Sequence, residues 1–109
     1  MFSSIDHIVV VASSLDIGIK YVYEKLGVMP QKGGVHEKMG THNYLLNLGN
    51  STYLEVIAIN PDSPKPGRPR WFGLDTIETA AKPRLLTWVA RTDDINAAKK
   101  KCFNRTWRY

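Results

Sequence analysis

The feature that most restricts the possible folds of this chain is a repeated pattern of strand, helix cap and helix. It occurs twice, once on each side of a proline-rich segment. The first copy reads IDHIVVVASSLDIG from Ile5, and the second reads LLTWVARTDDINAA from Leu85. In each copy a short apolar strand is followed by polar residues that suit a helix N-cap, and then by an apolar helical stripe. The two copies share a pattern more than an identity. They predict a fold built from two related modules.

The first copy predicts a complete strand and helix. Ile5–Val11 is β-branched and apolar, which is typical of a strand. Apolar residues then recur every three or four positions from Leu15 to Leu26, which predicts a helix of about three turns. Ser13 and Ser14 are candidate N-caps, and Gly27 is expected to end the helix.

The rest of the chain predicts further strands and one more helix. Residues 29–41 read as a loop with one short, poorly marked strand, and the alternation of Asn43–Leu48 and Thr52–Ile59 predicts an antiparallel hairpin. Residues 60–70 contain four prolines and predict an extended linker, anchored by the aromatic residues that follow. A short helix over 72–81 and a strand over 84–90 come next. A last helix, capped by Thr92 or Asp93, then carries Ile95, Ala98 and Cys102.

Composition and charge exclude several classes of protein. A chain of 109 residues with 43% hydrophobic side chains can bury one modest core. Its longest apolar run, Ile8–Ala12, is far too short to cross a membrane. The single Cys102 cannot form an internal disulfide and no signal peptide is visible, so we expect a cytoplasmic protein. Residues 1–98 carry ten basic and ten acidic side chains, so the net charge of +5 belongs to the tail. We therefore expect neither a nucleic-acid nor a membrane partner.

Alternation along two predicted strands brings metal-competent side chains to one face. His7 shares a side with Val9, and Glu55 shares a side with Ile57, whereas the opposite sides are apolar and suit packing against the helix. If these strands are neighbours, an imidazole and a carboxylate face each other, which is half of the shell of a divalent ion. A hydrogen-bonded core histidine and an edge glutamate fit the same pattern, so both interpretations stand at this point.

Other candidate residues carry weaker signals. His36 lies in the glycine-rich segment GGVHEKMGTHN and either lines a site or is exposed in a loop. His42 precedes a strand and is assigned no role. The serines lack a G-x-S-x-G context, Cys102 has no patterned histidine partner, and Gly33-Gly34 lacks the spacing of a phosphate-binding loop.

The D-H strand, the G-G-x-H-x-x-x-G-T-x-N loop and the Y-L-E strand together resemble the glyoxalase-like domains of the vicinal oxygen chelate superfamily. The resemblance covers residues 4 to about 98. It implies an α+β fold of paired βαβββ modules around a cleft. It implies that His7 and Glu55 hold a divalent metal ion (Zn, Ni, Mn or Fe), that Glu55 is catalytic, and that His36 and Asn43 bind substrate. The implied cleft mouth is lined by Gly34, His36, Gly40, Thr41 and Asn43.

The second half of the chain departs from that family pattern. We expect a first module at 1–60, a proline-rich linker and anchor segment at 61–83, and an incomplete second module with a basic tail at 84–109. Thr87 and Trp88 stand where a ligand is expected. The lysine run at 99–101 suggests a frameshift, so we expect a truncated chain or one that evolved to be short. We also expect a homodimer, because half of a paired fold leaves a sheet edge exposed.

The implied chemistry is metal-assisted, on a small oxygen-containing metabolite, and of the isomerase, lyase or dioxygenase type. Two protein ligands hold a catalytic ion poorly. We therefore expect an inactive short form unless His7 and Glu55 of two chains converge on one ion. The alternatives are a non-catalytic small-ligand-binding module of the bleomycin-resistance type and an incomplete fragment without activity.

Overall fold

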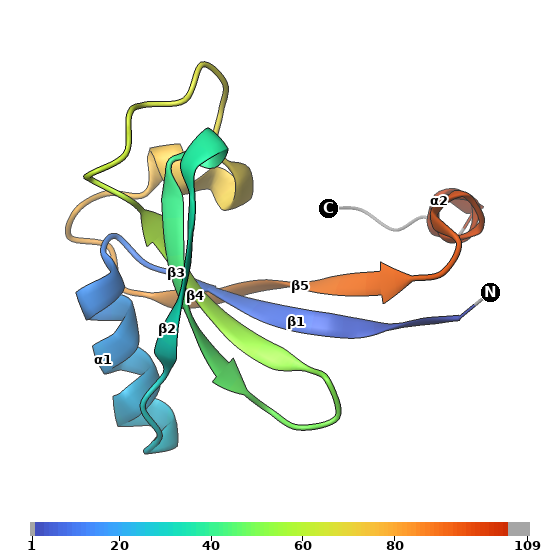
Figure 1. The fold of residues 1–109 in the computed structure, drawn as a ribbon, viewed down its shortest axis with the longest axis horizontal. Coiled ribbons are helices and arrows are strands. Elements are labelled where there is room, and N and C mark those ends of the chain that lie inside the picture. The colour runs from blue at the N-terminus through green and yellow to red at the C-terminus, as the bar shows by residue number, and fades with distance from the viewer. Residues whose placement is uncertain (1, 105–109) are drawn as a thin grey trace.

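Five strands form one mixed sheet, with a helix on one face (Figure 1). The computed structural model describes residues 2–104. The elements are β1 (Ser3–Val11), α1 (Leu15–Leu26), β2 (Gln31–His36), the 3-10 turn η1 (Glu37–Met39), β3 (Thr41–Asn47), β4 (Tyr53–Ile59), the 3-10 turns η2 (Trp71–Thr76), β5 (Arg84–Thr92) and α2 (Ile95–Asn104). The strand order is β2-β3-β4-β1-β5. The predicted α+β fold is confirmed: β1 to β4 with α1 form a βαβββ module, and β5 with α2 follow it.

Helix α1 begins and ends where its sequence predicts. The Ser14 hydroxyl oxygen accepts a hydrogen bond from the Ile17 N–H at 3.3 Å, and Gly27 takes the left-handed conformation with φ 72°. The buried face of the helix contains Gly18 and Val22. A Cβ at Gly18 would lie 2.4 Å from a Val56 methyl group, so this glycine allows the helix to lie directly on β4.

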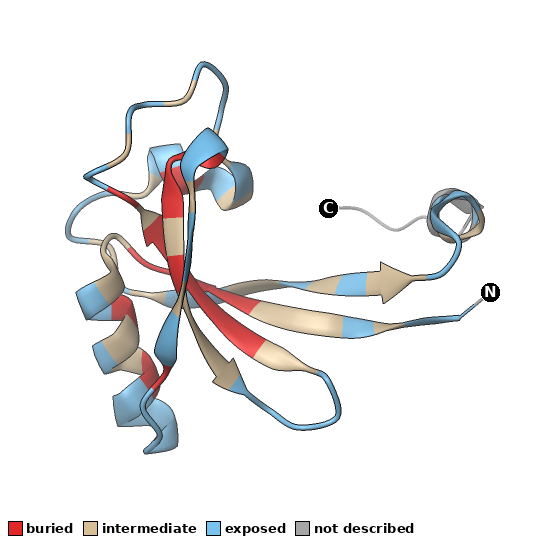
Figure 2. Ribbon diagram, in the orientation of Figure 1, coloured by how far each residue is buried: buried red, intermediate tan, exposed pale blue. Residues whose placement is uncertain are grey.

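The sheet has a core on each face, and the core against α1 is the one that the alternation of β1 and β4 predicts. Val10, Leu54 and Val56 of the sheet are buried against Val22 of α1. Val9, Val11 and Ile57 are buried on the opposite face, where Leu74 of η2 covers them. Figure 2 shows the buried residues gathered where β1, β3 and β4 meet. Glu55 lies on the η2 face, which is therefore the face of the candidate site.

Strand β1 lies between two long-range partners. It pairs in parallel with β4, with Val9 opposite Glu55, and antiparallel with β5. The β5 pairing is irregular between Ile5 and His7, where Asp6 is an extra residue in β1. Beyond the hairpin, β1 and β5 extend together away from α1, with α2 at their far end (Figure 1). The radius of gyration is 15.0 Å, against about 13 Å for a compact chain of this length.

One local expectation is confirmed and two differ from the structure. Residues 31–36 form β2 and pair with β3, although the sequence marked this strand poorly. The helix predicted over 72–81 is wrong, because the segment forms only 3-10 turns at 71–76 with Phe72 and Gly73 in left-handed conformations. The side chain that caps α2 is Asp94, whose carboxylate accepts the Ala97 N–H at 3.0 Å. The predicted tail beyond residue 104 lies outside the described residues. Within 2–104 no helix is long and apolar enough to span a bilayer.

Candidate metal centre

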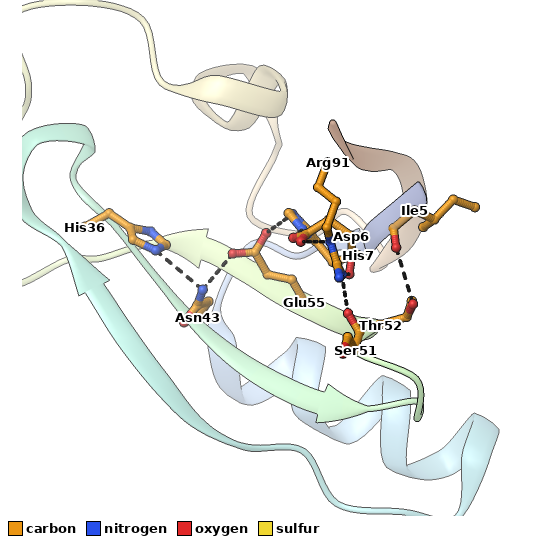
Figure 3. A network of polar contacts seen from close by, with 9 residues as sticks. All are labelled: Ile5, Asp6, His7, His36, Asn43, Ser51, Thr52, Glu55 and Arg91. Atoms are coloured by element: carbon orange, nitrogen blue, oxygen red, sulfur yellow. Dashed lines mark hydrogen bonds and ion pairs between the residues drawn. The ribbon is translucent and has the colours of Figure 1, made fainter. Parts of the chain in front are cut away.

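His7 and Glu55 meet on the η2 face of the sheet, at the junction of β1 and β4 (Figure 3). The His7 Nε2 atom lies 3.6 Å from the Glu55 Oε1 atom, and the two side chains are only 13% and 9% exposed. The hypothesis that these residues face each other required β1 and β4 to be neighbours, and they are. The structure thus brings together an imidazole and a carboxylate from strands that are 48 positions apart in sequence.

The gap between these two atoms fits a shared metal ion. A separation of 3.6 Å is too long for a hydrogen bond. A tetrahedral ion with bonds of about 2.1 Å holds its ligand atoms about 3.4 Å apart. His7 and Glu55 would therefore hold a divalent ion with little movement. Among the described residues, no group of three or more His, Cys, Asp or Glu side chains is close enough to complete a shell. The described part of the chain therefore supplies two ligands to a metal shell, His7 and Glu55.

Glu55 is held in place by Asn43 of β3. The Asn43 Nδ2 atom donates a 2.6 Å hydrogen bond to Glu55 Oε2, which leaves Oε1 directed toward His7. The Asn43 Oδ1 atom in turn accepts the Gly34 N–H at 2.7 Å, so the amide orientation is set from both ends. Gly33 is required beside it, because a Cβ there would lie 2.1 Å from Asn43 Oδ1.

His36 extends this network toward the tip of the β2–β3 hairpin. Its Nε2 atom accepts a long 3.4 Å contact from Asn43 Nδ2, and its Nδ1 atom lies 2.9 Å from the Thr41 hydroxyl. Because Nε2 accepts, Nδ1 carries the proton and donates to Thr41. The edge of the Trp71 ring system lies against His36, with centroids 5.4 Å apart. The structure therefore places His36 and Asn43 beside Glu55; their roles in binding a substrate stay predictions.

The remaining cleft-mouth residues lie close to this network. Gly34 and Thr41 are bonded to Asn43 and His36, and Gly40 precedes β3 with its carbonyl oxygen accepting from Arg70 Nε at 3.3 Å. His42 is different: it points to the α1 face and lines a shallow groove of about 240 Å³ with Asp16 and Lys32 of the same chain. Burial there lowers the pKa of His42 below its usual value.

Sequence reasoning missed the residues that surround His7. Asp6 Oδ2 lies 2.7 Å from His7 Nδ1, and Arg91 of β5 donates to Asp6 Oδ1 at 2.8 Å. The Tyr53 ring stacks on the imidazole with centroids 4.7 Å apart and planes within 10°. The hydrogen bond from His7 and the pairing with Arg91 lower the pKa of Asp6, and burial raises the pKa of Tyr53. Strict alternation places Asp6 and His7 on opposite faces, whereas in the structure β1 has a bulge at Asp6 and the two side chains meet.

Comparisons with known proteins identify the family and the fold of the chain. The sequence profile of the family described as "Glyoxalase-like domain" matches residues 5–107. The methylmalonyl-CoA epimerase of Mycobacterium tuberculosis has a similar structure, with a TM-score of 0.59 at 19% identity over 95% of this chain and 65% of the epimerase chain. A hypothetical protein from Staphylococcus aureus gives a TM-score of 0.60 at 22% identity over 99% of this chain and 44% of that one. No curated protein sequence matches.

The element order and the two similar structures identify the fold of the chain. A βαβββ module followed by the opening strand and helix of another, matched by those two structures, is the vicinal oxygen chelate fold. The chain belongs to the glyoxalase-like domain family of that superfamily. It spans less than two thirds of the length of either solved structure.

Proposed function

We propose that this chain provides a metal site for chemistry on a small oxygen-containing metabolite, of the isomerase, lyase or dioxygenase type. The observation that carries the proposal is the 3.6 Å gap between His7 Nε2 and Glu55 Oε1, which suits a divalent ion such as Zn, Ni, Mn or Fe. When bound, such an ion supplies Lewis acidity to a substrate oxygen. Members of the superfamily commonly use divalent metals, and the family match supports the same here.

The chain's own residues each have a distinct task in this proposal. His7 Nε2 and Glu55 Oε1 hold the ion. Glu55 is the proposed catalytic residue, because its carboxylate would hold the ion and so lie next to the reacting atoms of a substrate bound there. His36 and Asn43 bind and orient the substrate from the β2–β3 side, with Trp71 as an apolar wall beside His36. Because Glu55 and His7 are mostly buried, they act at low water content.

The proposal includes a second copy of the chain as partner. Strand β5 pairs with β1 on one side and is the last strand in the sheet order, so its outer edge has no strand partner among residues 2–104. Leu85 and Trp88 are 60% and 53% exposed beside that edge. An exposed strand edge of nine residues with such apolar side chains beside it favours association. A homodimer would complete the shell only where the His7–Glu55 pairs of both chains converge on one ion. The cytoplasmic location and the absence of nucleic-acid and membrane partners stay predictions.

Turnover with added metal tests the proposal. The purified chain is assayed with zinc, nickel, manganese or iron(II) against panels of isomerase, lyase and dioxygenase substrates. We expect turnover that a chelator abolishes and that Glu55→Gln removes, while Glu37→Gln, an acidic residue of η1, leaves it unchanged. Sedimentation in parallel should show a dimer. Turnover insensitive to chelator and to Glu55→Gln would contradict the proposed site, and a monomer at high micromolar concentration would contradict the proposed partner.

The second candidate is a non-catalytic small-ligand-binding module. This candidate is favoured because, among the described residues, the site has only two side chains that can bind a metal ion. The aromatic wall of Trp71 beside His36 suits a planar apolar ligand. A thermal-shift screen with aromatic compounds separates the two: the binding module is stabilised by such ligands without metal, and Trp71→Ala removes the shift. No shift with any ligand, together with no turnover, would leave a fragment without activity.

A further inference from the structure

We infer that Asp6 and Arg91 form a positioning pair that fixes the ring of His7, so that strand β5 contributes to the metal site without supplying a ligand. This inference rests on the proposed metal site and adds to it a structural role for the second module's strand. Neither residue touches Glu55 in the described contacts. Asp6 contacts the Nδ1 atom of the imidazole, whereas the gap to Glu55 is at Nε2, and Arg91 contacts Asp6 (Figure 3).

Asp6 sets which ring nitrogen of His7 carries the proton. An ionised carboxylate only accepts hydrogen bonds, so the 2.7 Å contact with Asp6 Oδ2 assigns the proton to Nδ1. The lone pair of the neutral ring is then on Nε2, the atom that faces Glu55 Oε1. A carboxylate on the rear nitrogen both sets the ring orientation of a metal-binding histidine and raises its basicity. Stacking on Tyr53 restrains the remaining rotation of the ring.

Asp6 is in turn anchored by β5. Asp6 is the extra residue of the β1 bulge, so the sheet ladder does not fix its side chain. Arg91 fixes it instead: Nε donates to Asp6 Oδ1 at 2.8 Å, and Nη2 reaches the Asp6 carbonyl at 3.5 Å. Nη2 also donates to the Ser51 carbonyl in the turn before β4. One guanidinium therefore ties β5, β1 and the β3–β4 turn together behind His7.

The chain contains a second arginine–aspartate pair that can be compared with Asp6–Arg91. It joins Arg70 and Asp75, with Nη1 and Oδ1 2.5 Å apart. Arg70 immediately precedes η2 and Asp75 lies within it, and the hydrogen bonds that Asp75 accepts come from Arg70 rather than from a histidine. Substituting Asp75 thus removes the same kind of carboxylate from the same kind of pair without removing a contact of His7 or Glu55. It is the matched control for Asp6.

Calorimetric titration with Zn²⁺ alone tests the pair. We expect Asp6→Asn to weaken zinc binding about 10- to 100-fold, Arg91→Met to weaken it less, and Asp75→Asn to leave it unchanged. Because Arg91 acts through Asp6, the double variant Asp6→Asn/Arg91→Met should bind zinc as Asp6→Asn does. Wild-type affinity in Asp6→Asn, or an equal loss in Asp75→Asn, would overturn the inference.

A second readout separates this inference from the metal site itself. In the metal-free chain, nitrogen-15 spectra of the histidine rings should show His7 with its proton on Nδ1, and this preference should weaken in Asp6→Asn and in Arg91→Met. If wild type binds no zinc, the proposed metal site fails, and the ring spectra alone decide the positioning pair. If the spectra of wild type and Asp6→Asn agree, the pair does not position His7. Thermal unfolding of each metal-free variant confirms that it is folded.

Discussion

Replacing Asn43 with alanine removes the residue that connects the two sides of the candidate site. Its amide donates to the buried Glu55 carboxylate at 2.6 Å and accepts the Gly34 N–H at 2.7 Å. A hydrogen bond to a charged group contributes about 1.5–3 kcal/mol, and a neutral one about 1 kcal/mol. Asn43 is only 8% exposed, so water does not readily replace these bonds. We expect Asn43→Ala to lower the free energy of unfolding by about 2–4 kcal/mol.

Urea unfolding measures this loss, and Asn47→Ala is its control. Asn47 lies on the same strand and its side chain also accepts a backbone N–H, that of Gly49 at 2.7 Å, but the bond is exposed and neutral. Its removal should cost about 1 kcal/mol or less. In a Glu55→Gln background, the cost of Asn43→Ala should fall by about 1 kcal/mol, because the charge on the acceptor is gone. If Asn43→Ala costs no more than Asn47→Ala, the reasoning about the buried network is wrong.

Three further predictions follow from the packing and the pKa of His42. Gly33→Ala should destabilise the fold by about 1–3 kcal/mol, because its Cβ would lie 2.1 Å from Asn43 Oδ1, whereas Gly34→Ala meets nothing within 4 Å and should be nearly neutral; equal urea midpoints would contradict this. Gly18→Ala should also destabilise, because its Cβ would lie 2.4 Å from Val56, and an unchanged thermal midpoint would argue against close packing of α1. Because burial lowers the folded-state pKa of His42 from 6.5, its contribution to stability is complete above that value and is lost as the pH falls through the folded-state pKa. Wild type should therefore lose more stability than His42→Gln between about pH 7.5 and about pH 5.5, and equal losses would show that His42 does not titrate in this way.

The first module was largely predictable because its signals are local. Period-two alternation in β1 and β4 assigns His7 and Glu55 to one face, and the capping residues Ser14 and Gly27 set the limits of α1. These features depend on residues near one another in sequence. The family resemblance implied that His7 and Glu55 hold one ion, and their meeting depends on the pairing of β1 with β4, which the structure shows.

The parts that could not be predicted depend on long-range pairing or on left-handed backbone. Strand β2 has two glycines and few apolar residues, and its pairing with β3 is accompanied by the Gly34–Asn43 hydrogen bond. The bulge at Asp6 depends on the register between β1 and β5, which are about 85 residues apart. No pattern in the sequence around Asp6 therefore predicts it. Phe72 adopts φ 59° in η2, a conformation that apolar periodicity cannot signal.

A crystal of the chain grown with Zn²⁺ and measured at the zinc absorption edge tests the proposed site most directly. If His7 and Glu55 hold the ion, the anomalous peak should lie between His7 Nε2 and Glu55 Oε1, about 2.0–2.2 Å from each. The two atoms should then stay close to their present separation of 3.6 Å. A zinc peak at His42 or His36 with none between His7 and Glu55 would contradict the proposed metal centre.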